Sequence, residues 1–157
     1  MNYYNGIAKG YNSLYMAEQM KKFENTRNLI GNYKLALDLG CGTGFITEHL
    51  NNIIGVDSSV EMLKLCPDNL KIVCADISKL PFKNGIFDLV YSLTTLQDVD
   101  DVNAAILEIK RVIKPNGRIV LSVLNKSKIN EIRKILKKEF ENLKEKENYN
   151  DIVFFTQ

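Results

Sequence analysis

The sequence predicts an α/β fold, in which a doubly wound, mostly parallel sheet of about six strands carries helices on both faces. Three observations predict it. Short apolar runs alternate along the chain with polar segments of helical length. Three of these runs carry an aspartate at or near their carboxyl end. The first run is followed directly by glycines at alternate positions within residues 40–44, which is typical of a turn that approaches a ligand closely.

Composition limits the classes of protein that the chain can represent. Its 157 residues are 45% hydrophobic and 25% charged, as in a single globular domain. The net charge of +2 argues against a strongly electrostatic nucleic-acid binder. No apolar run approaches the roughly 20 residues of a membrane span, and the first residues lack the pattern of a signal peptide. We therefore expect one cytoplasmic domain over 1–157, with a helical cap over 1–32 and the core over 33–157, and no membrane partner.

The three cysteines, Cys41, Cys66 and Cys74, form neither an even set nor a metal-binding spacing. They indicate free thiols in a reducing compartment, and we assign no metal.

The predicted strands follow the apolar runs at residues 35–39, 53–57, 70–76, 86–92, 119–124 and 151–156. Helices are predicted over 13–30, 45–50 and 60–65, the last opened by a capping-box pattern, Ser58-Ser59-x-Glu61. Asp100 or Asp101 can cap a further helix whose apolar face runs over 105–113. Lys-Pro-Asn-Gly at 114–117 predicts a turn. A last helix opens near Ser127, with apolar spacing over 129–143.

The glycine loop is the strongest functional signal. Glycine lets the backbone lie against a ligand, and the N–H groups of a following helix suit an anionic or polar ligand. Asp38 is unusual in a buried apolar strand and needs a cationic or hydrogen-bonding partner. The dinucleotide fingerprint G-x-G-x-x-G is one candidate, but here the third glycine, Gly44, comes one residue early.

The segment Leu37-Asp38-Leu39-Gly40-Cys41-Gly42-Thr43-Gly44 closely resembles the first motif of class I S-adenosylmethionine (SAM) methyltransferases, hydrophobic-D-h-G-x-G-x-G. Leu80-Pro81-Phe82, Phe87-Asp88-Leu89-Val90 and Arg111–Gly117 resemble later landmarks of the same family, with Asn116 in place of a glycine. The lead-in over 4–11 resembles small methyltransferases of the ubiquinone-methylase type, in which this segment packs over the bound cofactor. The resemblance implies a Rossmann-like sheet with a seventh, antiparallel strand. This chain stops too soon for that strand, so we expect it to be absent.

The resemblance also implies a SAM site at the carboxyl ends of the strands. Asp57 would accept the two ribose hydroxyls, Asp76 would accept the adenine amino group, and the N–H of Ile77 would contact a ring nitrogen. On this basis the expected cofactor-binding residues are Tyr11, Asp38, Gly40, Cys41, Gly42, Gly44, Asp57, Ser58, Met62, Asp76, Ile77, Ser92 and Leu93.

A sulfonium methyl group is already activated, so the enzyme's main task is to align donor and acceptor. We assign no catalytic residue, because the single histidine, His49, is expected on a helix beside the sheet. Gln97 and Asp98 are the expected contacts on the acceptor side. The family's Asn/Asp-Pro-Pro-Tyr/Phe motif for amino-group methylation is absent after residue 92.

The leading hypothesis is a SAM-dependent methyltransferase that acts on a small-molecule acceptor. A tRNA or protein methyltransferase that needs an activator subunit is an alternative, so nucleic acid or such a subunit is a second class of partner. A SAM-binding regulatory module without catalysis is another alternative. A nicotinamide-dependent dehydrogenase is disfavoured by the glycine spacing.

Overall fold

The computed structural model describes residues 2–126 and 128–157, without the side chains of residues 2–5, 7, 9 and 11. Seven strands form one sheet in the order β3-β2-β1-β4-β5-β7-β6. The strands are β1 Ala36–Leu39, β2 Ile53–Asp57, β3 Lys71–Cys74, β4 Phe87–Leu93, β5 Ile113–Leu124, β6 Lys144–Asn148 and β7 Asp151–Phe155. The helices are α1 Asn2–Ile30, α2 Val60–Leu63, α3 Val102–Val112 and α4 Ile129–Glu139, with short 3₁₀ turns η1 Thr47–His49 and η2 Leu96–Asp98.

The order of the strands positions a binding site. From β1 the chain moves outward to β2 and β3, then crosses back so that β4 pairs with the other side of β1. All of these pairs are parallel, and β4 also pairs in parallel with β5. The carboxyl ends of β1 and β4 therefore flank the point at which the strand order reverses. In open α/β sheets a ligand binds at this point.

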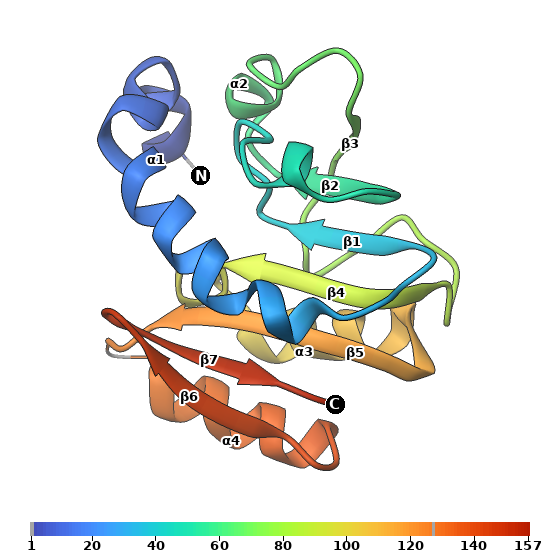
Figure 1. Cartoon of the computed structure of the whole chain (residues 1–157). Helices are drawn as coiled ribbons and strands as arrows, with labels where there is room; N and C mark the ends of the chain where they lie inside the picture. Colours follow the sequence, from blue (N-terminus) through green and yellow to red (C-terminus); the bar gives the residue numbers. More distant parts are fainter. Residues whose placement is uncertain (1, 127) are drawn as a thin grey trace.

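Helices cover the two faces of the sheet. Figure 1 shows α1 running across the front of the sheet, whereas α3 and α4 lie behind it. The core behind the sheet contains the apolar faces of α3 and α4, including Ile106, Ile109, Ile132 and Leu136, which are fully buried. Asp101 caps α3 by accepting a hydrogen bond from the Ala104 amide at 2.9 Å, which confirms one of the two expected caps. None of the helices in the described part is long and apolar enough to cross a bilayer.

A buried ion pair fixes α1 to the sheet. Lys22 on α1 is 1% exposed, and its Nζ lies 2.9 Å from Oδ1 of Asp151 on β7. The other oxygen of Asp151 accepts a hydrogen bond from Ser122 on β5 at 2.6 Å. Asn25 on α1 also donates to Asn148 at the end of β6. The carboxyl-terminal half of α1 is thus bonded to the antiparallel edge of the sheet.

The expectation that the seventh strand would be absent is wrong. β7 runs antiparallel to β5, and the additional strand β6 pairs with β7 along its full length. The sequence of β6, Lys144-Glu145-Lys146-Glu147-Asn148, has no apolar residue, so no hydrophobic pattern reveals it. It can be polar because it is an edge strand whose side chains are mostly exposed. The predicted last helix, extended to residue 143, ends at Glu139 instead.

Other elements also differ from the predictions. Helix α2 ends at Leu63 rather than residue 65, and β3 covers only Lys71–Cys74. The expected helix over 45–50 is only the 3₁₀ turn η1, so the glycine loop does not open an α-helix. Helix α1 begins at Asn2 rather than near residue 13. The expected turn at 114–117 lies within β5, where the register shifts against β4 between Phe87 and Leu89, as in a β-bulge. Ser127, near which the last helix was expected to open, lies outside the described residues.

Candidate functional site

The glycine loop folds back against the end of β2. The amides of Gly40 and Cys41 both donate to the Val56 carbonyl oxygen, at 2.7 and 3.0 Å. Gly40 has a φ of 73° and Gly44 one of 76°, in the left-handed region that favours glycine. A Cβ atom at Gly40 would collide with the side chain of Thr95, and one at Gly44 would lie 2.6 Å from Cδ1 of Leu70. Both positions therefore require glycine, because the backbone is left-handed and because a side chain would collide with its neighbours.

Asp57 connects this loop to the end of β2. Its Oδ2 accepts a hydrogen bond from the Gly42 amide at 2.9 Å, and its Oδ1 accepts one from the Ser59 amide at 2.8 Å. Ser59 in turn caps α2 by accepting from the Met62 amide. Burial raises the pKa of Asp57, against the lowering effect of hydrogen bonds from the backbone of Ser59, Gly42 and Ser58. Each carboxylate oxygen can accept a second hydrogen bond, so Asp57 retains acceptor capacity for a ligand.

Asp38 is a buried acid at the centre of the site. Asp38 is 3% exposed, and its carboxylate accepts a hydrogen bond from the Thr47 hydroxyl at 2.7 Å. Burial raises the pKa of Asp38 to about 7, the nearby charge of Asp57 adds to the rise, and the Thr47 hydrogen bond opposes it. A ligand that brings a positive charge next to Asp38 would stabilise its ionised form.

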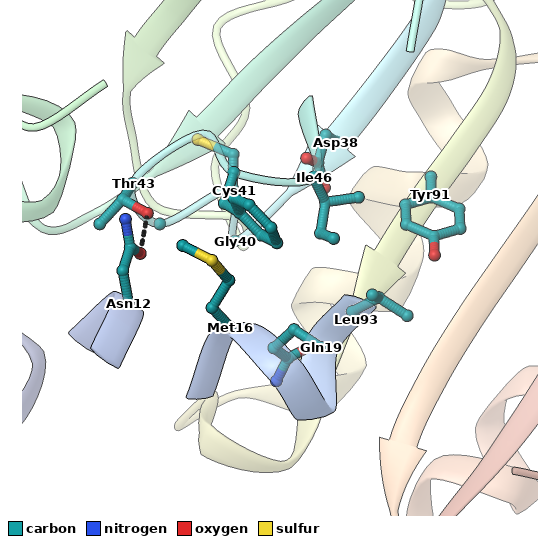
Figure 2. Close-up of a pocket in the computed structure, with 12 residues that line it drawn as sticks. Asn12, Met16, Gln19, Asp38, Gly40, Cys41, Thr43, Ile46, Tyr91 and Leu93 are labelled. Atoms are coloured by element: carbon teal, nitrogen blue, oxygen red, sulfur yellow. Dashed lines mark hydrogen bonds between the residues drawn. The ribbon is translucent and has the colours of Figure 1, made fainter. Parts of the chain in front are cut away.

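A cavity of about 40 Å³ lies between α1 and the glycine loop. Asn12 and Met16 of α1 point towards the loop, whereas Gln19 lies near Leu93 of β4 (Figure 2). Tyr91 of β4 also lines the cavity. The Thr43 hydroxyl donates to Asn12 at 2.7 Å, which holds α1 against the loop. Small-molecule sites are typically about 300–1,000 Å³. A nucleoside bound here must therefore extend beyond this cavity or displace the first half of α1.

No lysine, arginine or histidine is among the described residues that line the cavity. Asp38 thus faces a space without a protein cation. SAM carries a sulfonium and an ammonium group, so the charge of the site and the glycine loop both fit this cofactor.

The carboxyl end of β4 is tightly bonded to its neighbours. The hydroxyl of Ser92, 1% exposed, donates to the Leu39 carbonyl at 2.8 Å, and the buried Tyr91 hydroxyl lies 2.9 Å from Thr26 Oγ1 on α1. Thr94 has a positive φ of 52°, which is strained for a β-branched residue. Gln19 of α1 donates to the Thr94 hydroxyl at 3.0 Å. The switch point between β1 and β4 is therefore closed by α1.

The other expected cofactor residues lie outside the cavity. Asp76 is exposed, and its Oδ1 accepts hydrogen bonds from the amide and hydroxyl of Ser78. Ile77 and Met62 are buried, and the Met62 methyl group lies 3.2 Å from where a Cβ of Gly42 would stand. Ser58 is exposed beside Asp57. The side chain of Tyr11 lies outside the described residues.

The expected acceptor-side pair is not part of the cavity lining. The Gln97 amide group donates to the Thr94 carbonyl and to Asp98, and its Oε1 is buried without a hydrogen-bond partner within the described residues. His49 also lies away from the cavity, with its ring edge-on to Phe23 and Phe45. No group of three His, Cys, Asp or Glu side chains in residues 2–126 and 128–157 is arranged to hold a metal ion.

The structure adds cavity residues that the sequence analysis did not select. On α1, residues 12, 16 and 19 share one face at helical spacing. That spacing was a usable signal, although it does not indicate what the face packs against. The remaining additions are the loop residues Thr43, Phe45 and Ile46 and the strand residue Tyr91.

A family model described as "Methyltransferase domain" matches residues 37–121. An uncharacterized protein of Methanocaldococcus jannaschii is 36% identical over 147 residues, which cover 90% of this chain and 59% of that protein. A malonyl-[acyl-carrier protein] O-methyltransferase of Methylovorus sp. is 34% identical over 115 residues, 62% of this chain and 39% of that protein. The chain thus spans between about two fifths and three fifths of the length of these curated relatives.

Two solved structures share the whole fold. A SAM-dependent methyltransferase of Thermotoga maritima, described as a possible histamine N-methyltransferase, superposes with a TM-score of 0.84 at 20% identity and covers 97% of this chain and 96% of that one. A Haloferax volcanii methyltransferase, solved with the Trm112 methyltransferase activator, gives 0.75 at 15% identity and covers 98% and 96%. The family match over the sheet and its glycine loop identifies the chain as a member of the class I SAM-dependent methyltransferases, a family in which SAM is the methyl donor.

Proposed function

We propose that this chain transfers a methyl group from SAM to a small-molecule acceptor. The observation that carries the proposal is the pair of acids at the glycine loop. Asp57 is bonded to the Gly42 amide at the end of β2, and the buried Asp38 faces a cavity lined by no basic residue. Asp57 offers hydrogen-bond acceptors at one end of the site, and Asp38 offers a negative charge at the other end. A nucleoside with a cationic tail requires both.

In this proposal each acid has a separate role. Asp57 accepts the ribose hydroxyls through the lone pairs that the Gly42 and Ser59 amides leave available. Asp76 and the Ile77 amide receive the adenine, and Asp38 balances the positive charge of the methionine end. Gly40, Cys41, Gly42 and Gly44 supply the loop backbone, and Ser92 and Leu93 hold the end of β4 beside it. When bound, SAM supplies an activated methyl group, so the chain needs mainly to orient the acceptor and exclude water.

The cavity lining indicates the chemistry of the acceptor. Met16, Phe45, Ile46 and Leu93 are apolar, and Asn12 and Gln19 supply amide groups. The absence of a basic residue from this described lining disfavours an acceptor that presents a carboxylate or phosphate to it. We therefore propose a small, neutral or amine acceptor that reaches this cavity when α1 moves away from the glycine loop. Gln97 and Asp98, with a buried unpaired amide oxygen on Gln97, remain the proposed contacts beyond this cavity.

Thermal unfolding of the purified chain with SAM, S-adenosylhomocysteine or NADH tests the cofactor. A ligand at 100 times its dissociation constant adds about 2.7 kcal/mol of stability, or several degrees for a domain of this size. We expect a shift with SAM and S-adenosylhomocysteine and none with NADH. A shift with NADH alone would contradict the proposal.

Methyl transfer is then measured with radiolabelled SAM and small amines. Labelled SAM that is bound without turnover would favour the regulatory alternative.

A second candidate is a methyltransferase that needs an activator subunit to act on a macromolecule. Two features favour it. The strand β3 at the edge of the sheet carries the half-buried Ile72 and Val73. Near this strand, Val60 and Leu65 are 49% and 46% exposed. An edge strand with nearby apolar side chains can add a strand from a partner. Purification from the native cell with a tag on the chain separates the two candidates. A stoichiometric subunit lost on Val60→Glu would favour this candidate, whereas a monomer with turnover on small acceptors would exclude it.

A further inference from the structure

Two of the three cysteine thiols meet at the glycine loop. Cys41 stands between Gly40 and Gly42 in the loop, and Cys66 follows the short helix α2. Sγ of Cys66 donates at 3.4 Å to the carbonyl of Gly42, the residue next to Cys41. The two thiols are close enough for each to shift the pKa of the other. The pair therefore spans the loop and the segment after α2, which lie far apart in the sequence.

The two thiols differ in access. Cys41 is 8% exposed, whereas Cys66 is only half-buried. The interaction with Cys41 lowers the pKa of Cys66, and the same interaction together with burial raises the pKa of Cys41. Cys66 is thus both the more accessible thiol and the one whose thiolate is favoured.

The third cysteine provides an internal control. Cys74 ends the edge strand β3 and is exposed. Its thiol donates to the Ser58 carbonyl at 3.9 Å. It faces the same solvent and oxidant as Cys66 without a second thiol as hydrogen-bond partner.

We propose that Cys41 and Cys66 form an oxidisable dithiol site, at which a small disulfide such as glutathione disulfide converts the pair to an intramolecular disulfide and lowers the affinity for SAM. The oxidation itself is independent of the proposed methyl transfer. The effect on affinity rests on cofactor binding at the glycine loop.

The chemistry follows ordinary thiol–disulfide exchange. The Cys66 thiolate attacks one sulfur of glutathione disulfide, forms a mixed disulfide and releases one glutathione thiolate. Cys41 then attacks the sulfur of Cys66 and releases the second glutathione. The two protein thiols are oxidised, the glutathione disulfide is reduced to two glutathione molecules, and the two thiol protons end on these products.

Forming the disulfide between Cys41 and Cys66 must disturb the glycine loop. The sulfur atoms move from non-bonded contact to a bond of about 2.05 Å, and Cys41 is held on both sides. Its own amide and that of Gly40 donate to Val56, and the amide of Gly42 donates to Asp57. Moving Cys41 towards Cys66 displaces the amide that orients Asp57. Because binding linkage is reciprocal, bound SAM should also shift the equilibrium of the pair towards the two free thiols.

The test begins with the thiols themselves. Wild-type protein and the variants Cys41→Ser, Cys66→Ser and Cys74→Ser are equilibrated with defined ratios of reduced to oxidised glutathione, blocked with a thiol reagent, digested and analysed by mass spectrometry. We expect a peptide that links Cys41 to Cys66 in the wild type and in Cys74→Ser, and in neither of the other variants. Wild-type protein that ends only in mixed disulfides, or in a pair that includes Cys74, overturns the proposal.

The second readout is SAM affinity by calorimetry on the reduced and the oxidised Cys74→Ser protein. We expect oxidation to weaken SAM binding by roughly 5- to 150-fold, the usual range for coupled sites, and reduction to restore it. Equal affinity in the two forms overturns the coupling to the cofactor. If reduced protein binds no SAM at all, the proposed function fails, while the cysteine mapping still decides whether the dithiol site exists.

Discussion

The carboxylate of Asp57 is bonded to the amide of Gly42 at 2.9 Å, so the acid at the end of β2 and the glycine loop after β1 form one unit. The same carboxylate accepts from the Ser59 amide that begins α2. A ligand bound to Asp57 would therefore be placed relative to the loop by these two hydrogen bonds. This arrangement makes Asp57 the most direct test of the cofactor site.

Replacing Asp57 with alanine should weaken SAM binding by about 1.5–3 kcal/mol, because the change removes a charged acceptor of hydrogen bonds. Calorimetric titration with SAM measures this loss. Asp68→Ala is a matched control, since Asp68 is an exposed acid on the loop after α2 and should leave the affinity unchanged. Equal affinity in Asp57→Ala and the wild type would refute the assignment of Asp57 to the ribose.

Replacing Asp38 with asparagine should stabilise the free protein at neutral pH. The pKa of Asp38 is raised from 3.8 to about 7 by burial, so between these values the folded chain holds a proton that the unfolded chain has lost. The free energy of unfolding therefore falls as the pH rises from about 4 to about 7, by roughly 4 kcal/mol for this group. Asparagine does not titrate, so this loss is absent from the variant.

Urea unfolding at pH 4 and pH 8 measures the effect for wild type and Asp38→Asn. The free energy of unfolding of the variant, relative to that of the wild type, should increase as the pH rises. The variant should also bind SAM more weakly than the wild type. Thr47→Val is the control for the hydrogen bond, because it removes the donor to Asp38 and leaves the acid in place. A stability difference that is independent of pH would show that Asp38 is not the titrating group.

Apolar runs predict six of the seven strands. Five of them, β1, β2, β4, β5 and β7, lie inside the sheet, where side chains on both faces are largely buried, and the edge strand β3 still carries the half-buried Ile72 and Val73. Strand β6 was not predicted, because an edge strand pairs with a neighbour on one side only and can be built from lysine, glutamate and asparagine. The motif residues from 38 to 44 and Asp57 lie together as the spacing indicated. Their ligand contacts remain predictions. The helical spacing of residues 12, 16 and 19 indicates that they share a face of α1, but that this face closes the cavity could not be predicted, because spacing does not show what a face packs against.

The ion pair between Lys22 and Asp151 should contribute strongly to the position of α1. Lys22→Met leaves Asp151 buried without its cation, and breaking a buried pair in this way costs about 3–5 kcal/mol. Glu18→Gln removes only the half-exposed second partner of Lys22 and should cost under about 1 kcal/mol. Chemical denaturation of both variants tests the difference, and similar losses in the two would mean that Asp151 is not the principal partner.

Replacing Gly42 with valine should abolish SAM binding and leave a folded protein. Gly42 has a φ of 56°, and a Cβ there would lie 3.2 Å from the Met62 methyl group. A branched side chain therefore fills the space above the loop and strains the amide that donates to Asp57.

Gly85→Val is the matched control. Gly85 has a similar φ of 61°, and its Cβ would meet only the Ile113 carbonyl at 4.0 Å, outside the loop. Both variants therefore carry comparable backbone strain, but only Gly42→Val should lose the thermal shift with SAM. Retained binding in Gly42→Val would remove the glycine loop from the cofactor site, and loss in both variants would assign the effect to stability rather than to the site.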